Sequence, residues 1–129
     1  MQDTQTSHFW VGRFPKIVAE SYFAEMYDEN DPDRKHTPLS MFARDQGVKW
    51  YDHDFLEYGW GRASTIQKLV KGYSYSDQWA DELARRVEAA GLTEINWFAF
   101  LSRDEIRKPK SARYHLYWLH YLGTIEYRI

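Results

Sequence analysis

The alternation of apolar and polar residues predicts one strand and one helix in the first part of the chain. The largely apolar run at residues 8–14 is typical of a strand. Pro15 then suits the first turn of a helix, where a missing N–H group costs nothing. We expect this helix to pack one face on a core and to end near Tyr27. Its apolar positions, which recur at helical spacing, are Ile17, Val18, Tyr22 and Met26.

The middle of the chain predicts a short strand region between helical segments. Residues 42–47 are typical of a short helical turn that ends at a glycine, and residues 48–58 favour extended backbone. Ser64 is predicted to cap a short helix. Ser76 is predicted to cap a longer helix that ends at Gly91, and this is the clearest helix in the sequence. The apolar face of the longer helix comprises Trp79, Leu83, Val87 and Ala90.

The last third of the chain favours strands. Residues 95–101 are nearly all apolar, which is typical of a central strand with both faces covered. Residues 114–122 alternate, and residues 124–129 are predicted to form a further strand after a glycine. This order predicts an α+β fold, with a mostly antiparallel sheet of about four to five strands covered on one face by about three helices. We expect a single domain over residues 1–129, with a flexible N-terminal segment at residues 1–7.

Composition indicates a binding surface and removes several kinds of chemistry. Aromatic residues make up 18% of the chain, which argues against disorder and favours some rings at an interface. The absence of cysteine excludes disulfides, thiolate catalysis and zinc–cysteine sites. No signal peptide or apolar membrane span is apparent, so we expect a cytoplasmic protein with no membrane partner. The net charge of −2 makes the chain a poor candidate for binding nucleic acid.

The adjacent residues Asp52, His53 and Asp54 are the strongest candidate for a metal-dependent enzyme. Histidine and carboxylates bind zinc, manganese and iron, and both Asp45 and Glu57 lie nearby in the sequence. On a strand, however, the histidine would point away from both carboxylates, so a metal would need ligands from another segment. The alternative is an acidic edge with a surface or hydrogen-bonded histidine, and we expect no cofactor.

Two other patterns offer weaker catalytic or phosphate-binding candidates. Asp28, Glu29, Asp31 and Asp33 could pair for acid–base catalysis, but a loop rich in Pro and Asp is more typical of a solvated surface. The segment at residues 59–61 contains two glycines but lacks the lysine of a phosphate-binding loop and the dinucleotide fingerprint. No residue cluster therefore predicts a catalytic site.

A basic run followed by aromatic residues is the candidate for single-stranded nucleic acid, because phosphates bind cations and bases stack on rings. Two acids, Asp104 and Glu105, interrupt the run, which favours a solvated loop that leads into a core strand. The residues concerned are Arg103, Arg107, Lys108, Lys110 and Arg113, followed by Tyr114, Tyr117, Trp118 and Tyr121.

The segment at residues 50–57 mixes aromatic rings with acids. Exposed rings give contact energy at an interface, and acids steer a basic partner toward it. The alternative is that the rings belong to the core while the acids keep the protein soluble. The sequence pattern alone leaves both interpretations open.

The chain resembles the bacterial Immunity protein 22 family over roughly residues 8–101. Its most specific part is the turn at residues 43–47, with sequence Ala-x-Asp-x-Gly, followed by Tyr-Asp-x-Asp-Phe at residues 51–55. Other parts that carry the resemblance are residues 9–12, 21–23, 71–72 and 73–76. Past Leu101 the likeness is less clear.

The resemblance implies a cytoplasmic protein that binds a bacterial toxin and blocks it without catalysis. The partner would be the cognate toxin, and the protein itself a monomer or weak dimer. Positions that match the family then become candidates for the toxin interface, and the acids are better candidates than the rings for surface contacts. These positions are Asp45, Trp50, Tyr51, Asp52, Asp54 and Glu57.

Overall fold

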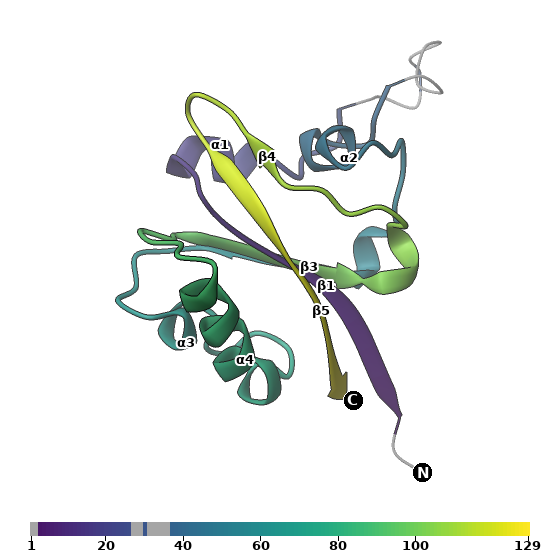
Figure 1. Cartoon of the computed structure of the whole chain (residues 1–129). Helices are drawn as coiled ribbons and strands as arrows, with labels where there is room; N and C mark the ends of the chain where they lie inside the picture. The colour runs from purple at the N-terminus through teal and green to yellow at the C-terminus, as the bar shows by residue number, and fades with distance from the viewer. Residues whose placement is uncertain (1–2, 27–29, 31–36) are drawn as a thin grey trace.

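The computed structural model describes residues 3–26, 30 and 37–129, which form one antiparallel sheet with helices packed against it (Figure 1). The strand order across the sheet is β2-β3-β1-β5-β4, so β1 lies at its centre. The α+β class and the antiparallel sheet are therefore confirmed. The strands are β1 (Thr4–Arg13), β2 (Leu56–Trp60), β3 (Trp97–Ser102), β4 (Ala112–Arg113) and β5 (Trp118–Arg128).

Helices cover both faces of the sheet, whereas the sequence predicted helices on one face (Figure 1). The short helices α1 (Lys16–Ser21) and α2 (Met41–Asp45) lie on one face. The other face carries α3 (Ile66–Leu69) and α4 (Ser76–Ala89). In the described part of the chain, no helix is both long and apolar enough to cross a membrane.

Two hydrophobic clusters, one on each face, explain this arrangement. Successive side chains of a strand point to opposite faces, so Trp10 enters the cluster under α1 and α2, while Phe9 and Val11 enter the cluster under α4. On β3, Trp97 and Phe98 divide in the same way. Both strands are apolar on both faces, and an uncovered face would leave large rings in water.

Several element boundaries differ from those that the sequence predicted. Helix α1 ends at Ser21. Of its predicted apolar face, Ile17 is 77% exposed, whereas Tyr22 is buried just after the helix ends. Residues 4–7, expected to be flexible, belong to β1 and pair with β5. The predicted strands at 114–122 and 124–129 are largely one strand, β5, which runs through Gly123. The predicted helix end near Tyr27 and most of the following loop lie outside the described residues.

Side chains of α4 bond to the outer edge of β5, where the two-residue β4 no longer pairs with it. The Arg86 guanidinium donates to the carbonyl oxygens of Leu122 and Thr124, at 2.9 and 2.8 Å. The Gln78 amide donates to the carbonyl of Arg128 and accepts from its N–H group, both at 2.8 Å. An open strand edge is a site for unwanted pairing with other chains, and these bonds occupy part of it.

Gly12 allows β1 and β5 to approach closely. A Cβ atom at this position would clash with the carbonyl oxygen of Trp118, which is part of the backbone and cannot rotate away. We predict that Gly12→Ala lowers the free energy of unfolding by about 2 kcal/mol, the usual cost of overpacking. The control is Gly61→Ala, where the nearest atom is 3.7 Å from the new Cβ. Urea unfolding measures both variants, and equal stability of the two would contradict the predicted close approach.

Candidate partner-binding surface

The six positions predicted at the interface do not form one surface. Tyr51 is 1% exposed and the Asp45 side chain is 1% exposed, so both lie inside the protein. Trp50 is 60% exposed and Asp54 is also exposed, whereas Asp52 and Glu57 are partly buried. Direct contact with a partner is therefore open to Trp50, Asp52, Asp54 and Glu57, and the two buried residues act on the fold.

Tyr51 anchors the segment that carries the exposed residues. Its ring packs edge-on against Phe42 and stacks on His53, with ring centroids 5.6 and 5.0 Å apart. Its hydroxyl lies 3.2 Å from the hydroxyl of Ser40, the residue that caps α2. Burial raises the pKa of Tyr51 to about 12, so its hydroxyl stays neutral at physiological pH. The burial of Tyr51 thus fixes the segment to the core, while Trp50 is exposed and Asp52 is partly exposed.

Two carboxylates hold the turn at residues 50–55, one from within the turn and one from another segment. Asp52 precedes a short 3-10 helix, and its carboxylate accepts a hydrogen bond from the N–H group of Asp54 at 3.0 Å. The N–H group of Asp52 donates to the carboxylate of Glu105 at 2.7 Å. Phe55, at the end of the turn, is 55% exposed. The turn therefore presents two rings, Trp50 and Phe55, beside three carboxylates.

Glu105 is a member of this surface that the sequence did not predict. It comes from the short 3-10 helix after β3 and lies 53 positions from Asp52 in the sequence. The two meet because Leu56 of β2 pairs with Leu101 of β3, which brings the preceding turn beside the end of β3. In the sequence, Glu105 appeared only as an interruption of a basic run, so no local signal pointed to it.

Glu57 follows the turn on β2, a strand at one edge of the sheet. Its carboxylate accepts a hydrogen bond from the N–H group of Ser74 at 3.2 Å, which ties β2 to the segment before α4. This bond gives Glu57 a structural role, and its partial exposure leaves the rest of the carboxylate open to a partner.

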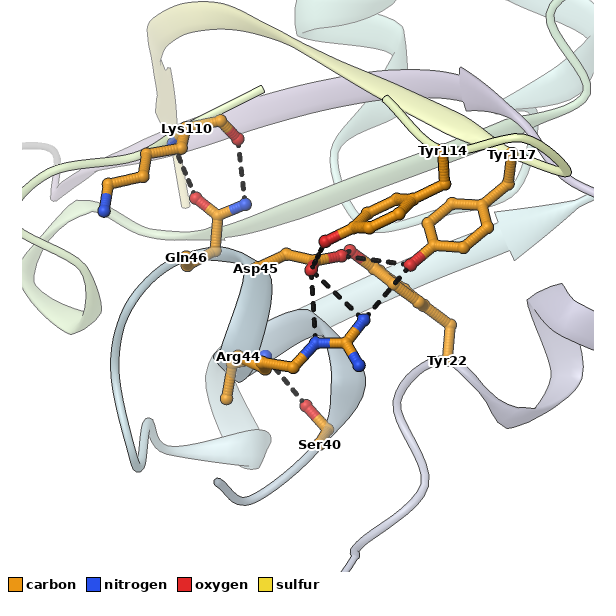
Figure 2. A network of polar contacts seen from close by, with 9 residues as sticks. Tyr22, Ser40, Arg44, Asp45, Gln46, Lys110, Tyr114 and Tyr117 are labelled. Carbon is orange, nitrogen blue, oxygen red and sulfur yellow. Dashed lines mark hydrogen bonds and ion pairs between the residues drawn. The ribbon is translucent and has the colours of Figure 1, made fainter. Parts of the chain in front are cut away.

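Asp45 lies in a network of tyrosine hydroxyls (Figure 2). Its Oδ2 atom accepts from Tyr22 at 2.7 Å and from Tyr117 at 3.3 Å. Its Oδ1 atom accepts from Tyr114 at 2.5 Å and from the Arg44 guanidinium at 3.3 Å. A buried carboxylate is costly unless such donors surround it, and here they come from four positions in the chain. Asp45 thus joins α2 to the turn between β4 and β5.

The tyrosines around Asp45 are held in the neutral form. Burial, followed by the hydrogen bond to Asp45, raises the pKa of Tyr22 far above its usual range. Burial and the nearby carboxylate raise the pKa of Tyr117, and the hydrogen bond to Asp45 raises that of Tyr114. A neutral hydroxyl can donate to the carboxylate, whereas a tyrosinate would repel it. The network is therefore suited to holding α2 against the β4–β5 turn.

The structure gives no support to the candidate metal site at residues 52–54 among the described residues. Among the residues that the structure describes, no group of three or more His, Asp and Glu side chains could hold a metal ion. The His53 ring stacks on Tyr51, and its buried Nε2 atom has no hydrogen-bond partner among the described residues. The paired carboxylates at positions 28, 29, 31 and 33 lie outside the described residues.

The basic and aromatic run does not form one surface either. Tyr117 belongs to the core, and the Tyr121 hydroxyl bonds to the buried His8 at 2.8 Å. The backbone of Lys110 is paired with the Gln46 amide through bonds of 2.6 and 2.9 Å (Figure 2). The side chains expected to stack on bases are therefore partly used in the fold.

The chain is a small α+β protein whose turn at residues 50–55 exposes aromatic rings beside acids. The family model named Immunity protein 22 matches residues 8–128, and the chain belongs to this family. The resemblance over residues 8–101 is thus confirmed, and the match extends through the C-terminal strands. No curated protein and no solved structure matches the chain.

The Asp45 network generates a prediction about stability. Asp45→Asn keeps the size of the side chain but removes its charge and one acceptor, so we expect a loss of about 1–3 kcal/mol in the free energy of unfolding. The pKa of Tyr114 should also fall, which a tyrosinate absorbance titration measures. The control is Asp54→Asn, whose exposed side chain should change stability by less than about 0.5 kcal/mol. Equal effects of the two substitutions would contradict the structural role of Asp45.

Proposed function

We propose that this protein binds a cognate bacterial toxin and neutralises it, acting in the cytoplasm and without catalysing a reaction. The observation that carries the proposal is membership of the Immunity protein 22 family over nearly the whole chain. An antidote of this kind works by occupying a surface that its toxin needs, so its own requirement is a stable and complementary contact face.

The turn at residues 50–55 supports a contact face of this kind. Trp50 is a large ring at 60% exposure, and aromatic side chains supply much of the energy at protein interfaces. Asp52, Asp54 and Glu105 add negative charge, which speeds the approach of a basic partner and disfavours an acidic one. The buried ring of Tyr51 restricts the turn before a partner binds, so less conformational entropy is lost on binding.

The proposal is tested with the toxin encoded next to this protein's gene. We expect co-expression to restore growth to bacteria that make the toxin, and the two proteins to co-purify as a complex. A toxin with an inactivating substitution serves as the control for toxicity. If the protein neither restores growth nor co-purifies with the toxin, the proposed function is wrong.

The contact face is tested by removing its charge without disturbing the turn. In the double variant Asp52→Asn and Asp54→Lys, the asparagine oxygen can still accept the bond that holds the turn. We expect at least about tenfold weaker binding to a basic toxin, because attraction is lost and repulsion added. Stability should change by less than about 0.5 kcal/mol.

The matched control is Asp81→Asn with Glu88→Lys, which makes the same change of charge on the exposed side of α4. Titration calorimetry measures both affinities, and thermal unfolding checks that both variants fold. Equal affinity of the two variants would exclude the turn at residues 50–55 as the contact face and leave toxin binding itself intact.

A further inference from the structure

A groove of about 1030 Å³ lies at the end of the sheet where β1 runs into α1. Four segments far apart in the sequence line it: residues 13–16, residues 60 and 62–63, residues 94–96 and residues 113–118. The turn at residues 50–55 precedes β2 and the groove follows it, so the two surfaces lie at opposite ends of that strand. The groove is therefore separate from the contact face described above.

Cations dominate the lining of this groove. Arg13, Lys16, Arg62 and Arg113 line it, and Glu94 is the only acid among its lining residues. The chain as a whole carries a net charge of −2, so this local excess of positive charge is not a consequence of a basic composition. We name this feature the cationic groove.

Three guanidinium groups of the cationic groove have no carboxylate partner among the described residues. The Arg13 side chain donates to a backbone carbonyl, that of Glu94, at 2.9 Å. Arg62 and Arg113 are exposed, and neither side chain forms a hydrogen bond or ion pair within the described part of the chain. On α4, by contrast, Arg85 and Arg86 both bond to Glu82. Like charges gathered without partners repel one another, and a bound anion removes that cost.

The floor of the groove is built before any partner arrives. The Asn96 side chain bonds to both backbone groups of Phe14, at 2.8 and 2.9 Å, and the Trp60 indole donates to the same Phe14 carbonyl at 2.8 Å. The Phe14 ring stacks on Tyr117, whose hydroxyl bonds to Asp45 (Figure 2). Asp45 thus positions one wall of the groove, although it does not line it. A preformed site loses less entropy on binding.

We propose that the cationic groove binds an acidic segment of a protein partner. Carboxylates fit the fork of a guanidinium group. Two exposed lining residues, the ring of Tyr114 and the aliphatic side chain of Leu116, offer contact to an apolar residue of the same segment. A nucleic acid is a poorer occupant, because its long run of phosphates would also meet the acids elsewhere on a chain of net negative charge.

The groove is tested on the purified protein without toxin, so its failure is distinct from failure of the proposed function. The probe is a short fluorescent peptide rich in Glu with a single Leu, compared with a Lys-rich peptide and a single-stranded DNA oligonucleotide of matched charge. We expect the acidic peptide to bind and its affinity to fall as salt is added. Its binding should shift the NMR amide signals of the groove residues, which are residues 13, 14, 16, 60, 62, 63 and 113–118.

Charge reversal assigns the binding to particular residues. The variant Arg62→Glu with Arg113→Glu should bind the acidic peptide at least about tenfold more weakly. The matched control, Lys71→Glu with Arg107→Glu, reverses two exposed cations outside the groove. Its affinity for the acidic peptide should stay within about twofold of that of the unchanged protein, and salt should weaken peptide binding to the same degree in both proteins. Circular dichroism checks that both fold. Equal loss in both variants, no peptide binding, or tighter binding of the oligonucleotide would overturn the proposal.

Discussion

The central strand β1 is buried on both faces, and the rest of the structure is arranged around that constraint. It pairs with β3 on one side and with β5 on the other, and residues 7–12 are all buried. Trp10 and Phe9 point in opposite directions, so two separate cores are needed to cover them. The clearest helix, α4, can cover only one face. The other is covered by short helices and loops, which need further bonds to stay in place.

Asp45 supplies those bonds for the second face, and its role explains why the predicted interface divides in two. The carboxylate holds α2 to the turn between β4 and β5 through the hydroxyls of Tyr114 and Tyr117, and the hydroxyl of Tyr22 joins the end of α1 to the same carboxylate. Tyr51 holds the next segment by burying its ring against α2. These two residues of the family-matching motif therefore support the fold, while Trp50 and Asp54 between and after them face solvent. Residues that support the fold thus alternate with solvent-exposed residues in one short stretch.

Patterns in the sequence predicted the elements that neighbouring residues determine. They failed for boundaries and surfaces that depend on contacts between distant segments. The helix predicted to end at Gly91 is α4, which ends at Ala89. Trp79, Leu83 and Val87 of its predicted apolar face are buried, whereas Ala90 is exposed. For α1 the same spacing misled, because Tyr22 and Phe23 enter the core after the helix has ended. Gly123 marks an irregularity inside β5, near the register shift opposite residues 8–10, and not the end of a strand. The acids of the turn were visible in sequence, but Glu105 and the cationic groove exist only once distant segments meet.

The distribution of charge follows from the same assembly. The turn at residues 50–55 and the cationic groove lie before and after β2, and five residues of strand span roughly 16 Å. An interface of ordinary size covers about 800 Å² on each partner, which is wide enough to reach across that distance. A partner that approached this edge of the sheet would meet negative charge at one end of β2 and positive charge at the other. Such a pattern fixes the orientation of binding, since a reversed partner would place like charges together at both ends.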